Sequence, residues 1–259
     1  MGDRSKIEWT DATWNPTTGC TKVSAGCDHC YAHTLANGRL SDIYLRRLPV
    51  IGTDENSRDP FAIRIWEDRL DQPRRWADPR MVFVNSMSDL FHVDVPEAFL
   101  RRIFEVMLSV DQHVYQVLTK RPSRAVRFFE RNADLFPSGS IPDHIWMGTS
   151  VEREDVLYRV DQLRALRAEV RFLSCEPLLG PLDLNLDAIH WVIVGGESGI
   201  GFRRLSLDWV RSIRDQCEAA DVPFFFKQVG GRTPKAGGRL LDGETWNGLP
   251  EVHPRMAVV

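Results

Sequence analysis

The stretch Met81-Val82-Phe83-Val84-Asn85-Ser86-Met87-Ser88-Asp89 shows the pattern on which the fold prediction depends. Its first four residues are apolar on both faces of an extended chain, and polar residues follow them at once. A short strand with two apolar faces is typical of a parallel sheet that is covered on both sides. We therefore predict a buried parallel strand over residues 81–84 that ends at a polar turn.

Similar apolar runs recur roughly every 20 to 33 residues, and amphipathic stretches separate them. They lie at residues 114–118, 145–148, 170–173, 191–194 and 223–226. One amphipathic stretch places Leu207, Val210, Ile213 and Cys217 on a single helical stripe behind Ser206, a helix-capping residue type. This rhythm predicts repeated βα units with right-handed crossovers, an α/β fold.

Polar residues follow each apolar run. The carboxyl ends of parallel strands form the ligand-binding edge in barrels and open α/β sheets alike, so we expect these residues to line a binding mouth. They are Ser86, Ser88 and Asp89; Thr119, Lys120 and Arg121; Thr149, Ser150 and Glu152; Cys175 and Glu176; Glu197 and Ser198; and Lys227 and Gln228.

The composition of the 259 residues, 43% hydrophobic and 27% charged, excludes a disordered chain, a collagen-like repeat and a disulfide-stapled miniature protein. No apolar run reaches the roughly 18 residues of a membrane span, and Ile7-Glu8-Trp9 interrupts any apolar signal core, so we expect a cytoplasmic protein without a membrane partner. The net charge of −3 argues against a protein that coats nucleic acid, although a local basic groove is compatible with it.

The prediction is one domain over residues 1–259. Within it, residues 38–66 lack clear periodicity and are expected to form an insertion, while the Gly- and Pro-rich residues 228–259 are expected to form an irregular wrapping tail. We expect four apolar side chains to anchor this tail to the body. They are Leu240, Leu241, Trp246 and Leu249.

Three of the five cysteines, Cys20, Cys27 and Cys30, crowd into residues 14–33, which indicates metal binding or catalysis in a cytosolic chain. Three thiolates on a glycine-containing loop suit three irons of a 4Fe–4S cluster and leave the fourth iron open for a ligand. Structural zinc, with His29 or His33 as fourth ligand, is the alternative, although a second C-x2-C pair or a downstream histidine pair is missing.

The loop resembles the cluster loop of radical S-adenosylmethionine (SAM) enzymes, whose usual spacing is C-x3-C-x2-C with an aromatic residue before the last cysteine. Here the first gap is six residues, and His29 occupies the aromatic position. The longer gap, with Trp14-Asn15-Pro16 before it and Cys30-Tyr31-Ala32 after it, is similar to a phage-associated three-cysteine family of radical SAM-like proteins. The similarity extends through residues 174–179, 195–199 and 226–228.

The resemblance implies a partial (β/α)6-type barrel whose first strand lies near residues 7–14. It also implies a 4Fe–4S cluster, reductive cleavage of SAM to a 5′-deoxyadenosyl radical, and hydrogen abstraction from a substrate. A flavodoxin- or ferredoxin-type electron donor follows from the need to reduce the cluster. The phage association points to a nucleotide or nucleic-acid substrate. A zinc-stabilised nucleic-acid-binding or scaffold protein without redox chemistry is the alternative function.

By position, the resemblance assigns the turn with Ser86, Ser88 and Asp89 to the SAM amino group, although the usual Gly-Gly-Glu is absent. Thr149 and Ser150 are candidates for the ribose hydroxyls, and Lys120 and Arg121 for the SAM carboxylate or an anionic substrate. Four further residues are candidate catalytic groups, each with a structural alternative. They are Cys175, which core packing explains equally well, Glu176 and Glu197, which salt bridges explain, and Lys227, which a surface charge explains.

Overall fold

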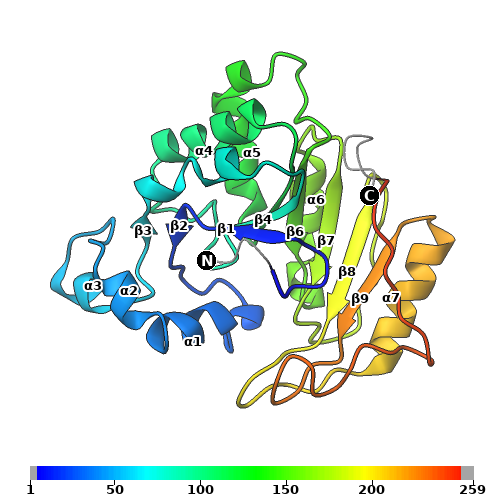
Figure 1. Ribbon diagram of the computed structural model, residues 1–259. Coiled ribbons are helices and arrows are strands. Elements are labelled where there is room, and N and C mark those ends of the chain that lie inside the picture. Colours follow the sequence, from blue (N-terminus) through cyan, green and yellow to red (C-terminus); the bar gives the residue numbers. More distant parts are fainter. Residues whose placement is uncertain (1–4, 252–259) are drawn as a thin grey trace.

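A sheet of seven parallel strands dominates the computed structural model, which describes residues 5–251 (Figure 1). The strands are β1 (Ala12–Trp14), β4 (Met81–Val84), β5 (Val114–Thr119), β6 (Ile145–Ser150), β7 (Arg171–Cys175), β8 (Trp191–Gly195) and β9 (Phe224–Gln228), in this spatial order. All strands predicted from the apolar runs are present, and the expected first strand forms at the end of the segment 7–14. Within the described residues β1 and β9 do not pair, so the curled sheet is a partial barrel.

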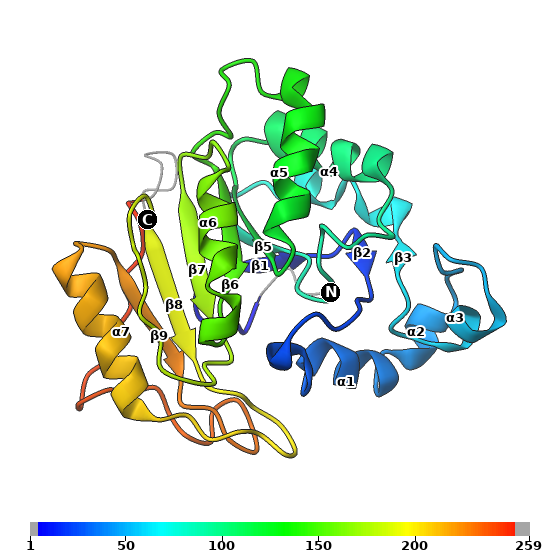
Figure 2. The same ribbon diagram turned by 180° about the vertical axis from the view of Figure 1, so that it is seen from behind.

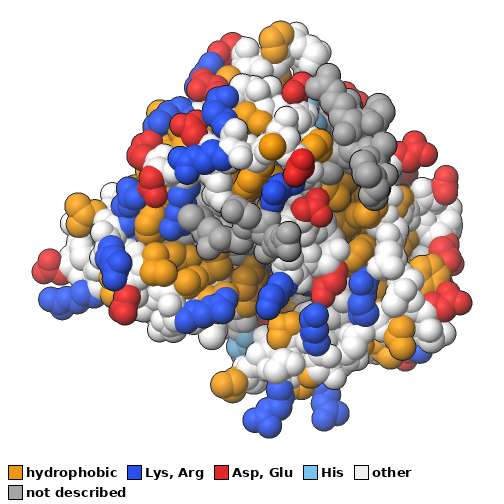
Figure 3. Space-filling view, viewed as in Figure 1, with side chains coloured by type: hydrophobic (Ala, Val, Ile, Leu, Met, Phe, Trp, Pro, Cys, Tyr) orange, Lys and Arg blue, Asp and Glu red, His pale blue; other side chains and the backbone are white. Residues whose placement is uncertain are grey.

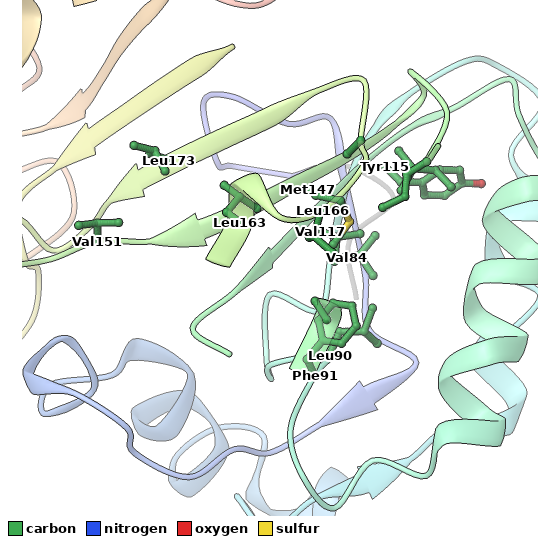
Figure 4. Packing of buried hydrophobic residues seen from close by; sticks show 14 of the residues in the cluster. Val84, Leu90, Phe91, Tyr115, Val117, Met147, Val151, Leu163, Leu166 and Leu173 are labelled. Atoms are coloured by element: carbon green, nitrogen blue, oxygen red, sulfur yellow. The ribbon is translucent and has the colours of Figure 1, made fainter. Parts of the chain in front are cut away.

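Helices cover the outer face of the sheet (Figure 2). The main ones are α4 (Glu97–Ser109), α5 (Pro122–Arg131), α6 (Tyr158–Arg164) and α7 (Leu207–Ala219). Alternate strand residues such as Val84, Val117 and Met147 pack with helix and loop residues such as Leu163 and Phe91 in one large apolar cluster (Figure 4). The period of two along each strand thus divides the apolar residues between two cores.

The second core fills the concave side with aromatic rings. Trp9 lies 4.8 Å from Phe83 and 6.0 Å from Trp191 between ring centroids, and Trp146 lies 5.8 Å from Trp191. Trp191 and Trp146 are the first residue of β8 and the second residue of β6, Phe83 is the third of the four residues of β4, and Trp9 precedes β1. Since the barrel interior is filled at the amino end, a ligand has access from the carboxyl end.

The predicted insertion 38–66 is more ordered than its sequence suggested. It contains α2 (Ser41–Leu45), α3 (Asp54–Arg58) and β3 (Arg64–Ile65), and β3 pairs antiparallel with β2 (Thr17–Thr18). Helix α1 (Tyr31–Asn37) precedes it, and short 3₁₀ helices lie at Ala25–Cys27, Glu67–Arg69, Gln72–Arg75, Ala133–Leu135 and Glu154–Val156. The buried Arg64 donates to the carbonyls of Arg47 and Asp59, both at 2.8 Å, and so holds the insertion together.

The tail packs along the edge of the sheet at β9. Phe226 N donates to Trp246 O at 3.0 Å, and Leu241 is fully buried. The prediction for the other two anchors was wrong: Leu240 and Leu249 are 57% and 39% exposed, because the chain there turns them toward solvent. Residues 252–259 of the predicted tail lie outside the described residues.

None of the helices within residues 5–251 combines the length and the apolar composition that a bilayer crossing requires.

Candidate active site

The cysteine loop, residues 19–30 between β2 and α1, lies across the carboxyl ends of the strands, where the binding mouth was expected (Figure 1). At its start, Gly19 N donates to Met87 O at 3.0 Å, and Cys20 N donates to Phe61 O at 3.1 Å. Gly19 has φ +91°, and a Cβ there would lie 2.3 Å from Ala62 O. Only glycine therefore permits the loop to approach the insertion and the turn after β4 this closely.

The contacts of Gly19 and Cys20 are the first tie between the cysteine loop and the rest of the fold, and Arg121, two residues after β5, makes the second. Its guanidinium donates to Thr21 O at 2.9 Å, to Cys20 Sγ at 3.5 Å and to Asp89 Oδ2 at 2.9 Å. Burial lowers the pKa of Arg121, but the charges of Asp89 and Cys20 outweigh burial and raise it. A permanently charged group thus lies directly beside the Cys20 thiol.

Asp89, predicted to meet the SAM amino group, is buried and already has four donors. It accepts from Phe91 N at 3.0 Å, Thr119 Oγ1 at 2.7 Å, Lys120 N at 3.0 Å and Arg121 Nη1 at 2.9 Å. An ionised carboxylate offers about four lone-pair positions. An ammonium group would have to displace one of these donors, and contact of Asp89 with SAM stays a prediction.

Glu152, after β6, makes the third tie and is only 1% exposed. It accepts hydrogen bonds from Ser24 Oγ and, at 3.3 Å, from Gly26 N of the cysteine loop. Arg159 of α6, also 1% exposed, donates to it at 3.1 Å, and Lys120 Nζ lies 3.9 Å away. The carboxylate therefore joins the loop to the sheet and to a helix beneath it.

Glu197, after β8, makes the fourth tie. Arg203 donates to it from N at 2.8 Å and from Nε at 3.0 Å, and His29 Nδ1 donates at 2.9 Å. Arg203 also donates to Ala25 O of the cysteine loop at 2.9 Å. Burial alone would raise the pKa of Glu197, but the hydrogen bonds from Arg203 and His29 outweigh it and hold this pKa below its usual value.

The substitution Glu197→Gln is expected to destabilise the protein in a pH-dependent way. A carboxyl group with a lowered folded-state pKa stabilises the fold above its unfolded-state pKa of about 4.3, and this contribution is lost as pH falls through the folded-state pKa. We expect a loss of about 1 to 3 kcal/mol in the free energy of unfolding at pH 7, as for hydrogen bonds to charged groups. Urea unfolding at pH 7 and pH 3 should show the difference between wild type and variant shrink at pH 3; an equal difference at both would contradict the assignment.

The three cysteines of the loop are free thiols and partly exposed. Cys20 and Cys30 pack against the same apolar cluster, which contains Phe61 and Met87. Burial, helped by Asp89 and Cys27 and opposed by Arg121, raises the pKa of Cys20 to about 11. Arg121 acts to lower this pKa and so favours the thiolate form, which is the form that binds a metal.

The chemistry of the three cysteine thiolates fits an iron–sulfur cluster. Thiolates on one tetrahedral zinc, with Zn–S of about 2.3 Å, lie roughly 3.8 Å apart. Within residues 5–251, no three His, Cys, Asp or Glu side chains are grouped closely enough to hold one metal ion. Cysteine thiolates are the usual ligands of a 4Fe–4S cluster, which takes them on separate corners.

Ser86 and Ser88 hold the turn after β4 to the segment after β1. Ser86 Oγ accepts from Asn15 Nδ2 at 3.2 Å, and Ser88 Oγ donates to Thr17 O at 3.1 Å. In the same turn Asn85 is 2% exposed, has φ +61° and donates from Nδ2 to Thr17 Oγ1 at 2.7 Å. Its Oδ1 is buried and has no hydrogen-bond partner among the described residues.

Thr149 and Ser150, the predicted ribose contacts, are buried at the end of β6. Thr149 Oγ1 donates to Thr119 O of the neighbouring strand at 2.8 Å, and Ser150 O accepts from Arg159 at 3.1 Å. The hydroxyl proton of Thr149 is therefore already used in a hydrogen bond within the sheet. Contact of either residue with ribose stays a prediction.

Glu176 and Lys227, predicted separately, form an ion pair of 2.9 Å at the mouth. Ser174 Oγ donates to the same carboxylate at 3.3 Å. The strands β7 and β9 that carry the pair lie on either side of β8, and a Cβ at Gly195 of β8 would lie 2.6 Å from Glu176 Oε1. The missing side chain at Gly195 gives Glu176 the space it occupies above β8.

Cys175 is fully buried in the large apolar core, as is Cys217 of α7. Burial raises the pKa of the Cys175 thiol well above its ordinary value, and the nearby Cys217 and Glu176 act in the same direction. The complete burial of Cys175 agrees with the alternative that it packs in the core. A catalytic role for it stays a prediction.

Two residues that the sequence analysis did not choose belong to this site: Arg159 and Arg203. Arg159 of α6 binds Glu152 in the segment after β6, and Arg203 binds both Glu197 in its own loop and Ala25 O, 178 residues away. Arginine spacing along the chain carried no signal for these partners.

Fold and site together define a class: a partial parallel barrel with a three-cysteine loop across its mouth. A family model matches residues 4–250, and the chain belongs to this family, DUF5131, described as a protein of unknown function. No curated protein matches the chain.

Solved structures similar to this chain include two of spore photoproduct lyase. The complex with dinucleoside spore photoproduct has 14% identity, covers 83% of this chain and 62% of its own, and has a TM-score of 0.48. A point variant of the lyase has 15% identity, covers 93% of this chain and 65% of its own, and has a TM-score of 0.47. This chain thus spans less than two thirds of the length of either lyase structure.

Proposed function

We propose that this protein is a radical SAM enzyme whose cysteine loop holds a 4Fe–4S cluster through Cys20, Cys27 and Cys30. The observation that carries the proposal is the position of the loop. It lies across the carboxyl ends of a parallel half-barrel and is tied to the ends of β4, β5, β6 and β8. Such an edge is where α/β enzymes bind their ligands.

Three thiolates leave one iron of the cluster free for a small ligand, as catalytic zinc sites leave one position free. When bound, the cluster would supply the electron that cleaves SAM reductively, and the resulting 5′-deoxyadenosyl radical would abstract a hydrogen atom from the substrate. A flavodoxin- or ferredoxin-type protein would supply the electron to the cluster.

The chain's own contribution is positioning. Asp89 holds Arg121 beside Cys20, and its four donors leave little room for an additional ammonium group. The unpartnered Asn85 Oδ1, in the same turn, is the better acceptor for the amino group of SAM, since a buried oxygen without a donor gains most from one. Ser86, Ser88, Thr149, Ser150 and Lys120 remain the other proposed SAM contacts.

We assign substrate binding to the part of the mouth that the cysteine loop does not occupy. The paired Glu176 and Lys227 lie there, partly exposed, and are proposed to contact the substrate. Glu197 acts through Arg203 and His29, which it holds against the loop, and is a positioning residue. A nucleotide or nucleic acid is the proposed substrate.

The test is anaerobic purification followed by iron, sulfide and zinc analysis, and then by addition of SAM and dithionite. We expect iron and sulfide in a ratio that fits one 4Fe–4S cluster, and 5′-deoxyadenosine among the products. Stoichiometric zinc without iron, in protein never exposed to air, would overturn the proposal. A cluster that yields no 5′-deoxyadenosine would show that SAM cleavage has been lost.

A further inference from the structure

Two glycine-rich loops lie side by side next to the cysteine loop. We call residues 198–206, after β8, and residues 229–241, after β9, the paired loops. Gly199 N donates to Gly231 O at 2.9 Å, and Gly231 N donates back to Glu197 O at 3.0 Å. These backbone bonds make the paired loops one surface at the carboxyl edge of the sheet.

The paired loops are strongly basic in an acidic chain. They contain no Asp or Glu, whereas the whole chain has a net charge of −3. Their cations are Arg203, Arg204, Arg232, Lys235 and Arg239. Arg203 is neutralised by Glu197, and Arg239 donates to Phe226 O at 3.3 Å and stacks on Phe225 at 5.1 Å.

The other three cations, Arg204, Arg232 and Lys235, are exposed and have no ion pair in the part of the chain that the structure describes. In Figure 3, Lys and Arg side chains project from the lower edge of the molecule, where Figure 1 shows these loops. Ile200, on the same surface, is 95% exposed. Exposed cations without counter-charges, beside an exposed apolar side chain, are typical of a surface that meets an anionic partner.

We propose that the paired loops bind the phosphate backbone of a single-stranded nucleic acid. This inference rests on the proposed function, because it assigns the substrate class of the same mouth. A site for one small phosphate would converge its cations and bury them; exposed cations spread over two loops instead match a chain of phosphates. Ile200 then offers apolar contact to an unstacked base.

The paired loops are also rigidly placed with respect to the reaction site. Arg203 bonds to Ala25 O of the cysteine loop, and His29 of that loop bonds to Glu197. A strand held on the paired loops therefore lies beside the mouth, where one of its nucleotides can be presented to the radical chemistry. The phosphates supply affinity, and the mouth supplies selectivity.

The test measures binding of fluorescein-labelled single-stranded DNA and RNA of about 20 nucleotides, longer than the roughly 4 to 16 nucleotides of one single-strand site. Fluorescence anisotropy is followed against salt with the full chain, without SAM or reductant. The variant combines Arg204→Gln, Arg232→Gln and Lys235→Gln. If all three side chains contact phosphates, the negative slope of the logarithm of the binding constant against the logarithm of the salt concentration should become shallower by about 2. This change is equivalent to roughly 100-fold weaker binding at 0.1 M salt.

A matched control removes the same charge elsewhere. Arg39, Arg46 and Arg58 of the insertion are exposed and, within residues 5–251, also lack ion pairs. Their triple replacement by Gln should change binding less than about 2-fold, and thermal unfolding should show that both triple variants are folded.

Three results would overturn the inference: no binding of either oligonucleotide by the wild type at 50 mM salt, equal losses in the two triple variants, or binding of phosphatidylserine vesicles in place of oligonucleotides. Stronger binding of DNA or of RNA would identify the source of the backbone. Since no cluster chemistry enters this assay, a failure of 5′-deoxyadenosine formation would count against the proposed function alone.

Discussion

Replacing Cys20, Cys27 or Cys30 singly by alanine is expected to abolish both iron binding and 5′-deoxyadenosine formation. Each thiolate would hold one iron, and two remaining thiolates do not retain a four-iron cluster. The loss should exceed the roughly 10- to 100-fold cost of removing a group that only supports a metal ligand. Iron content after anaerobic purification and product yield with dithionite and SAM are the measurements.

The matched control for these variants is Cys217→Ala. Cys217 is fully buried in α7, away from the mouth, and its replacement should cost about 1 kcal/mol of stability through lost packing while iron content is unchanged. If a variant of the loop retained iron at the level of Cys217→Ala, the replaced cysteine would not be a ligand. Retention in all three variants would leave the proposed cluster without its site.

Arg159→Met is expected to give the largest loss of stability among single substitutions at the site. It removes the closest cation, at 3.1 Å, from the carboxylate of Glu152, which is 1% exposed. Breaking a buried ion pair from one side costs about 3 to 5 kcal/mol, because the other charge stays buried. Lys120, at 3.9 Å, and the donors of the cysteine loop offset part of this, so we expect about 3 kcal/mol by urea unfolding at pH 7.

Two further variants isolate the cause of that loss. Adding Glu152→Gln to Arg159→Met removes the stranded charge and should recover more than half of the lost stability. Arg153→Gln breaks an ion pair with Asp155 in which both side chains are more than half exposed, and it should leave the midpoint of urea unfolding almost unchanged. Equal losses for Arg153→Gln and Arg159→Met would show that burial does not determine the effect.

The strands were predictable because both of their faces are buried. Residues 191–194 are all apolar, and in β8 Val192 and Val194 face the helices while Trp191 and Ile193 face the concave core. Such a run has no polar face and cannot be a surface strand. The edge at which the polar side chains gather then follows from parallel strand direction alone.

The hydrogen bonds and ion pairs at the mouth could not be predicted from the spacing of residues along the sequence. Glu197 and His29 are separated by 168 residues, and Glu152 and Ser24 by 128, so no periodicity along the chain connects them. The expected SAM contact of Asp89 is a related case: the sequence gives the carboxylate but not the four donors around it. The short helices of the insertion were not predicted for another reason: α2 and α3 have five residues each and are too short to show a helical period.

The four ties of the cysteine loop impose an order on how the protein can mature. Translation delivers the loop early, but its partners Met87, Arg121, Glu152 and Arg203 emerge one after another as the chain lengthens. The thiols made first are thus fixed in place last, when most of the chain has left the ribosome. Under the proposed function, a cluster delivered to the nascent chain would meet a loop that its partners do not yet hold, so delivery would follow the folding of the sheet.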